Sequence, residues 1–340
     1  MLTYLSRNIS SERLFNYNKE YAGIFLYLHI FNCKLKGETM PEDLMTLANK
    51  YRPTEFEDVC DQEVCTRVLT NQIKKNKFSH AQLFAGHAGC GKTTCAKIFA
   101  KKINGEIIEL DCATHGGVAE IKEIVEKART KPLLHDYKVV ILDECHCITK
   151  EGWSSLLIVL EEHLPSTIFV FCTTDTQKIP DTIMSRVQRL DFLPISNKGI
   201  AERLKAIMKL ESIEMDDEAL KYLVKSARGS LRQALTNLDK CLLYDDLSVD
   251  SVRKVLNMVS IDIFADICEA YNNSDTNKII ELIENVYNSG YELHQFTRQL
   301  LDYCIAKRAD LTLVERLLAT LQDIRYDDSP KNIIIARLIV

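Results

Sequence analysis

The stretch GHAGCGKT, Gly86 to Thr93, is the sequence feature that most restricts the fold. It fits the pattern G-x-x-x-x-G-K-[ST] and lies between an apolar run at 82–86 and a helical pattern that starts near Lys92. In this context the glycines turn successive backbone amides toward a polyphosphate, and the helix adds the positive end of its dipole. Lys92 is expected to reach the β- and γ-phosphates, with the Thr93 hydroxyl on Mg²⁺. The candidate nucleotide-binding residues of this loop are Gly86, Gly89, Cys90, Gly91, Lys92, Thr93 and Thr94.

Short apolar runs alternate with helical patterns between 82 and 173. Runs of four to six apolar residues, each followed by a helix, are typical of a parallel sheet buried on both faces. The sequence therefore predicts an α/β domain at 40–195. After Pro194 only helical spacing remains, which predicts a helical domain at 196–258 and a second, all-helical domain at 259–340.

The segment VVILDECHCITK, 139–150, ends a predicted strand with Asp143 and Glu144. One interpretation is a soft-metal site at Cys145, His146 and Cys147, but no C-x-x-C knuckle or second cysteine pair at zinc-like spacing accompanies them. The other is that Asp143 reaches the sheet edge of the glycine-rich loop and holds Mg²⁺, while Glu144 polarises the attacking water. The second interpretation predicts no zinc, and Cys145 and Cys147 then act as packing residues.

Composition excludes few functions. The 340 residues are 46% hydrophobic and 27% charged, with a net charge of −5, so any nucleic-acid contact must come from a local surface. The 12 cysteines show no disulfide framework, which favours a reducing, cytoplasmic setting. The apolar segment at 21–31 is too short to span a membrane. We expect residues 1–39 to be an extension outside the fold.

The sequence GSLRQAL contains a helix start with an unusual cation. Ser230 followed by Gln233 resembles a capping box, which places Arg232 in the first helical turn. A cation there opposes the helix dipole, so Arg232 either faces a bound phosphate or is an ordinary surface charge. Arg186, after a short proline-started helix, gives no signal of its own.

Several segments together resemble a known family, the ATPase (gamma/tau) subunit of the bacterial replicative clamp loader, DNA polymerase III, an AAA+ protein. The similarity covers about 46–340 and rests on order and spacing. The segments that carry it are NKYRPTEFEDV, GHAGCGKTTCAK, IIELDCATHGGV, VVILDECH, LEEHLPSTIFVFCTTDTQKIPDTIMSR and GSLRQAL.

The resemblance implies an AAA+ P-loop core, a helical lid and a C-terminal helical collar that closes a pentameric ring. It also implies roles for particular residues. Thr174 would be a sensor near the γ-phosphate, Arg232 a second sensor on the lid, and Arg186 an arginine finger that reaches the ATP of the adjacent subunit. The adenine would be bordered by Tyr51, Arg52, Pro53 and Val59.

By the same resemblance, the subunit binds and hydrolyses ATP with Mg²⁺ to open a sliding clamp and load it onto primer-template DNA. Its partners would be the clamp, the other ring subunits, the DNA and the replicative polymerase, with no membrane. Two departures from the family's pattern stand out: no four-cysteine zinc module follows the P-loop helix, and Asp61 stands where the family usually has glycine. We expect a form without the long tau tail.

Other functions fit parts of the pattern. A non-hydrolysing, stator-like scaffold would keep the fold without the chemistry, yet Lys92, Thr93, Asp143 and Glu144 are all present. A DExH helicase would need a second RecA-like core, whereas only helical patterns follow. Another AAA+ DNA-remodelling ATPase remains the further alternative.

Overall fold

The computed structural model describes residues 45–162, 164–324 and 330–339. The chain divides into two compact units, 1–50 and 51–340. The first contributes one described helix, α4 (Leu47–Lys50), and the expected extension at 1–39 lies outside the described residues. In the described part, no helix is long and apolar enough to cross a membrane.

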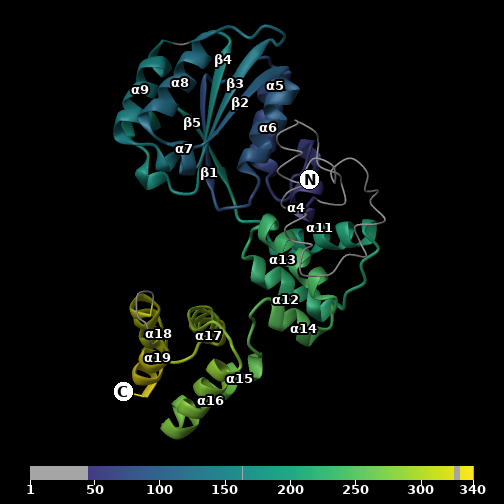
Figure 1. The fold of residues 1–340 in the computed structure, drawn as a ribbon, viewed down its shortest axis with the longest axis vertical. Helices are drawn as coiled ribbons and strands as arrows, with labels where there is room; N and C mark the ends of the chain where they lie inside the picture. The colour runs from purple at the N-terminus through teal and green to yellow at the C-terminus, as the bar shows by residue number, and fades with distance from the viewer. Residues whose placement is uncertain (1–44, 163, 325–329, 340) are drawn as a thin grey trace, which may run out of the picture. The chain divides into compact units, whose positions relative to one another are not determined.

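The residues from Tyr51 onward include a five-stranded sheet in the order β2-β3-β4-β1-β5, with every pairing parallel (Figure 1). The α/β fold predicted from the alternating pattern is confirmed. The order places β4 between β1 and β3, so the carboxyl ends of β1, β4 and β3 are neighbours. The strands are β1 (Ala81–Gly86), β2 (Gly105–Asp111), β3 (Tyr137–Asp143), β4 (Thr167–Thr173) and β5 (Gln188–Phe192).

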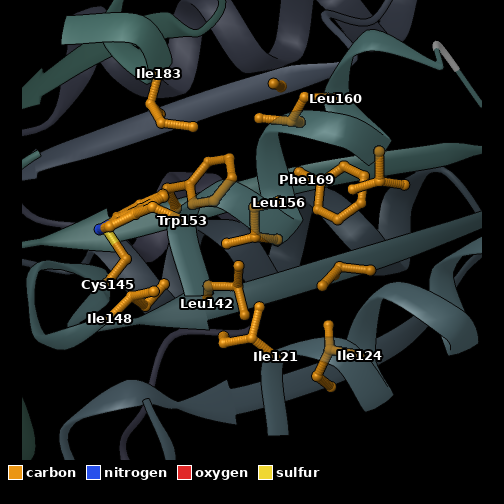
Figure 2. Packing of buried hydrophobic residues seen from close by; sticks show 14 of the residues in the cluster. Ile121, Ile124, Leu142, Cys145, Ile148, Trp153, Leu156, Leu160, Phe169 and Ile183 are labelled. Atoms are coloured by element: carbon orange, nitrogen blue, oxygen red, sulfur yellow. The ribbon is translucent and has the colours of Figure 1, made fainter. Parts of the chain in front are cut away.

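Helices cover both faces of this sheet. Because side chains alternate along a strand, Val140 and Leu142 of β3 enter one apolar core, while Val139 and Ile141 enter the other. The first core packs against α8 and α9, as Figure 2 shows for Ile121, Leu142, Trp153 and Leu156. The second packs against α5 and α6. The helices of this part are η2 (Phe56–Asp58), α5 (Glu63–Lys74), α6 (Lys92–Lys102), α7 (Cys112–His115), α8 (Val118–Arg129), η3 (Cys145–Cys147), α9 (Lys150–Glu161), η4 (Thr176–Lys178) and α10 (Asp181–Met184).

The strand β5 does not appear among the apolar runs that the sequence predicts. Its sequence QRLDF alternates, with Leu190 and Phe192 buried and the other three residues exposed. This is the pattern of an edge strand with one covered side, and β5 pairs only with β1. A search for period-two alternation would have found it.

Four helices follow the sheet, each begun by a side-chain cap: α11 (Asn197–Leu210), α12 (Asp217–Ala227), α13 (Leu231–Tyr244) and α14 (Val249–Val255). The predicted cap at Ser230 is confirmed, because its hydroxyl accepts a hydrogen bond from the Gln233 amide at 3.2 Å. The reciprocal half of a capping box is missing, since the Gln233 side chain donates to Asn237 instead.

Five more helices share a separate apolar cluster that includes Ile267, Ile283, Leu300 and Leu317, all fully buried. Gln299 of α17 joins this cluster to the preceding segment, accepting from the Val259 amide at 3.1 Å and donating to the Asn257 carbonyl at 2.9 Å. The helices are α15 (Ile261–Asn272), α16 (Thr276–Asn288), α17 (Leu293–Lys307), α18 (Leu311–Asp323) and α19 (Pro330–Ile339).

Candidate nucleotide site

The glycine-rich loop joins β1 to α6 as the sequence predicts. Lys92 is the first residue of α6 and is 5% exposed. Its ammonium donates to the carbonyls of Gly86 at 2.9 Å and His87 at 3.0 Å, which holds the side chain across the loop. A buried ammonium bound only by neutral carbonyls is a favourable partner for phosphate oxygens.

Gly89 lies where the loop meets helix α13. Its φ is +73°, and a Cβ there would lie 2.1 Å from the Ser230 hydroxyl and 3.2 Å from Cβ of Arg232. Only glycine fits this approach. The contact brings Arg232, an exposed cation in the first turn of α13, to the phosphate-binding loop. This proximity favours the phosphate-facing interpretation of Arg232 over an ordinary surface charge.

The acid pair faces the same loop. The Thr93 hydroxyl donates to Asp143 Oδ2 at 2.7 Å, and Asp143 Oδ1 accepts the Glu144 amide at 3.0 Å. A threonine hydroxyl and a carboxylate are oxygen ligands that suit Mg²⁺, which keeps waters and substrate phosphates as its remaining ligands. Thr93 and Asp143 therefore fit a magnesium ion, although they contact each other directly here.

Glu144 is held in an uncommon backbone conformation, with φ at +47°. Its Oε2 accepts a hydrogen bond from the Thr174 hydroxyl at 3.0 Å and lies 3.3 Å from His146 Nδ1. The same His146 nitrogen lies 3.1 Å from the Thr173 hydroxyl. The end of β4 thus orients the Glu144 carboxylate, and sequence reasoning did not place Thr174 in contact with Glu144.

The cysteines of the CHC segment lie in different surroundings. Cys145 is fully buried in the first core beside Ile148 and Trp153 (Figure 2). Cys147, in contrast, is exposed. Burial raises the pKa of Cys145 well above its usual value, which keeps that thiol protonated, and a thiolate is the form that binds metal. Nowhere in the described ranges do three His, Cys, Asp or Glu side chains gather as a metal-binding group.

The residues expected around the adenine lie near both the loop and α11. Val59 Cγ1 is 3.5 Å from where a Cβ on Gly91 would be, and the Arg52 Nε donates to the Thr94 hydroxyl at 3.2 Å. Tyr51 donates its hydroxyl to Glu211, which follows α11. Pro53 is half-buried in the same segment, and Cys90 is buried in the second core.

Arg186 lies outside this group of residues. Its guanidinium donates to the Thr182 carbonyl at 2.7 Å and pairs with Glu161 at 2.8 Å, with the side chain 40% exposed. Both partners are surface groups at the ends of α9 and α10. An exposed arginine with such weak attachments is available to a neighbouring molecule.

Comparison with known proteins agrees with this arrangement. Residues 82–195 match the ATPase family associated with various cellular activities (AAA), and 199–244 match the ATPase lid domain of the DNA polymerase III clamp loader subunit.

Among curated proteins, the chain is 33% identical over 298 residues to DNA polymerase III subunit gamma/tau of Mycoplasma genitalium, covering 78% of this chain and 50% of that protein. It is 32% identical over 279 residues to subunit tau of Bacillus subtilis, covering 74% and 50%. The chain thus spans about half the length of the curated relatives it matches.

Among solved structures, the Thermotoga maritima RuvB Holliday junction branch migration motor shares the fold, with a TM-score of 0.52 at 20% identity over 65% of this chain and 78% of that one. The two matched domains and the identity to curated gamma/tau subunits show that the chain belongs to the AAA ATPase family, in the gamma/tau subunit type of DNA polymerase III clamp loaders.

Proposed function

We propose that this chain is an ATP-hydrolysing subunit of a DNA polymerase clamp loader. The observation that carries the proposal is the set of contacts that joins Thr93, Asp143, Glu144 and Thr174 at one sheet edge beside Lys92. A non-hydrolysing scaffold would have no use for a glutamate oriented by a threonine at this place. The complete set of residues for hydrolysis therefore favours the ATPase over the stator-like alternative.

Each residue has a task in hydrolysis. The phosphates are bound by Lys92, the loop amides and Arg232. Mg²⁺ would be held by Thr93 and Asp143. When bound, Mg²⁺ neutralises charge on the β- and γ-phosphate oxygens. Glu144 accepts a proton from the attacking water, and Thr174 fixes its carboxylate in the required direction. The adenine is bordered by Tyr51, Arg52, Pro53 and Val59.

At the level of the molecule, we propose three domains: the nucleotide-binding core at 40–195, the lid at 196–258 and the collar at 259–340. The collar joins subunits into a pentameric ring, and Arg186 reaches the ATP of the next subunit. ATP binding then opens a sliding clamp for primer-template DNA at the replicative polymerase, and hydrolysis releases the clamp onto DNA. Another AAA+ DNA-remodelling ATPase is the alternative, and clamp loading distinguishes the two.

Nucleotide binding and turnover test the site with three variants. Lys92→Ala is expected to lose ATP binding, because it removes the buried cation from the loop. Glu144→Gln is expected to bind ATP as the wild type does but to lose about 10²–10⁴-fold in turnover. Glu281→Gln, an exposed glutamate change on α16, serves as the matched control. Turnover of either site variant at the wild-type rate would show that the assignment is wrong.

A further inference from the structure

The segment that leads from β5 into α11, Leu193–Ser196, is held by two consecutive side chains from a distant part of the chain. Gln62 donates its Nε2 to the Leu193 carbonyl at 2.7 Å and accepts the Leu193 amide at 3.1 Å. Asp61 Oδ2 accepts the Ser196 amide at 2.7 Å. We call Leu193–Ser196 the hinge segment, since it connects the sheet to the lid.

Asp61 is suited to this contact in two ways. Its φ is +55°, in the left-handed region that aspartate tolerates better than most residues. Its carboxylate also faces the amino end of α11, where negative charge is favourable. Gly199, in the first turn of α11, leaves space for this carboxylate, because a Cβ there would lie 2.6 Å from Asp61 Oδ2.

The loop that carries Asp61 also carries Val59, which lies beside Gly91 of the phosphate-binding loop. Helix α11 is therefore hydrogen-bonded near both ends to the segment 51–61, which carries the expected adenine-binding residues. Asp61 holds its start, and the Tyr51 hydroxyl donates to Glu211 just after its end.

The hinge segment is bonded to the lid as well. The Ile195 amide donates to the Gly229 carbonyl at 3.0 Å, and Gly229 directly precedes Ser230 and Arg232. Two hydrogen bonds, from Ser196 to Asp61 and from Ile195 to Gly229, thus connect the loop that carries Val59, through the hinge segment, to the start of α13.

We propose that Asp61 is a positioning residue: its carboxylate fastens α11 to the adenine-side loop, so that nucleotide binding at Val59 is coupled to the position of Arg232. The inference rests on the proposed nucleotide site. A lid already fixed to the base-binding loop loses less freedom when the phosphates bind to Arg232, which raises nucleotide affinity.

Three variants separate this role from a general effect on stability. Asp61→Gly keeps the backbone conformation and removes the carboxylate. Asp61→Asn keeps an oxygen acceptor for the Ser196 amide. The matched control is Asp245→Gly, which removes another aspartate with positive φ, at +60°, from the end of α13.

Hydrogen exchange of the nucleotide-free protein is measured first. In Asp61→Gly, amides 196–200 at the start of α11 are expected to exchange about fivefold faster than in the wild type, since a lost helix cap has an effect of this size. Amides 139–142 of β3 stay protected and show that the protein is folded. Asp245→Gly is expected to match the wild type, and Asp61→Asn, which keeps the acceptor but loses the charge, to lie between Asp61→Gly and the wild type.

Nucleotide affinity is measured on the same proteins with a fluorescent ATP analogue, with Lys92→Ala as a reference for lost binding. Asp61→Gly is expected to raise Kd about fivefold, and Asp61→Asn to raise it by a smaller factor. Wild-type affinity or unchanged exchange in Asp61→Gly would overturn the inference while leaving the proposed function in place. Equal binding by the wild type and Lys92→Ala would instead overturn the proposed function and the coupling together.

Discussion

At the scale of single residues, the Thr174 hydroxyl donates a hydrogen bond of 3.0 Å to the Glu144 carboxylate and so fixes its direction. Thr174→Val keeps the shape of the side chain and removes this donor. Steady-state ATP turnover is expected to fall at least about tenfold, since a misoriented general base loses much of its contribution, while ATP affinity stays at the wild-type value. Thr276→Val at the start of α16 is the control. ATP turnover by Thr174→Val equal to that of Thr276→Val would mean that Thr174 does not orient Glu144.

The cysteines of the CHC segment give a second test at this scale. Burial raises the pKa of Cys112 to about 12 and that of Cys145 well above its usual value, so neither thiol forms a reactive thiolate at neutral pH. Iodoacetamide at pH 7.5 is expected to label exposed Cys147 in the native protein and to leave Cys112 and Cys145 unlabelled. Peptide mass spectrometry reads the result. Protection of Cys147 that a zinc chelator abolishes would restore the soft-metal interpretation.

Sequence reasoning reached some of these contacts and missed others for physical reasons. A strand that ends in Asp143 and a loop that ends in Thr93 both point to the carboxyl edge of a parallel sheet, so their meeting could be predicted. The contact between Thr174 and Glu144 depends on β4 lying next to β3, and the local apolar pattern of a sequence does not predict strand order. The bond from Asp61 to Ser196 joins positions 135 residues apart and leaves no local pattern.

At the scale of elements, Lys138 ties strand β3 to the end of α8. It is 3% exposed, and its ammonium donates to the Lys127 carbonyl at 2.8 Å and to the Thr130 carbonyl and hydroxyl, both at 2.7 Å. These bonds satisfy carbonyls at the negative end of a helix. The buried lysine therefore has a structural role in joining a strand to a helix.

Lys138→Met removes the cation and with it the three hydrogen bonds that a charged donor makes to the end of α8. The free energy of unfolding of the core is expected to fall by about 2–3 kcal/mol. Urea unfolding followed by fluorescence of Trp153, the only tryptophan and 4% exposed, reports on this part of the chain. Lys122→Met on the exposed side of α8 is the matched control. Equal urea midpoints in the two variants would show that the Lys138 bonds contribute nothing.

At the scale of the whole molecule, a change at Arg186 tests whether ATP hydrolysis needs a neighbouring subunit of a ring or proceeds within one subunit. Arg186→Ala is expected to bind ATP normally and to lose about 10³-fold or more of the hydrolysis stimulated by clamp and primed DNA in the assembled complex, because a neighbour's arginine stabilises the transition state. The control is Arg189→Ala, another exposed arginine that pairs with Asp191. Full stimulation in Arg186→Ala would place the chemistry within one subunit.

The central claim is that ATP hydrolysis in this chain drives clamp loading. Its most direct test is the transfer of a labelled sliding clamp to primed DNA by the assembled complex, with the wild-type chain or with Glu144→Gln. The wild type is expected to leave the clamp on DNA once ATP is added, and Glu144→Gln to bind clamp and DNA but keep the clamp attached to the loader. Equal release of clamp by both proteins, or no clamp binding by either, would contradict the account.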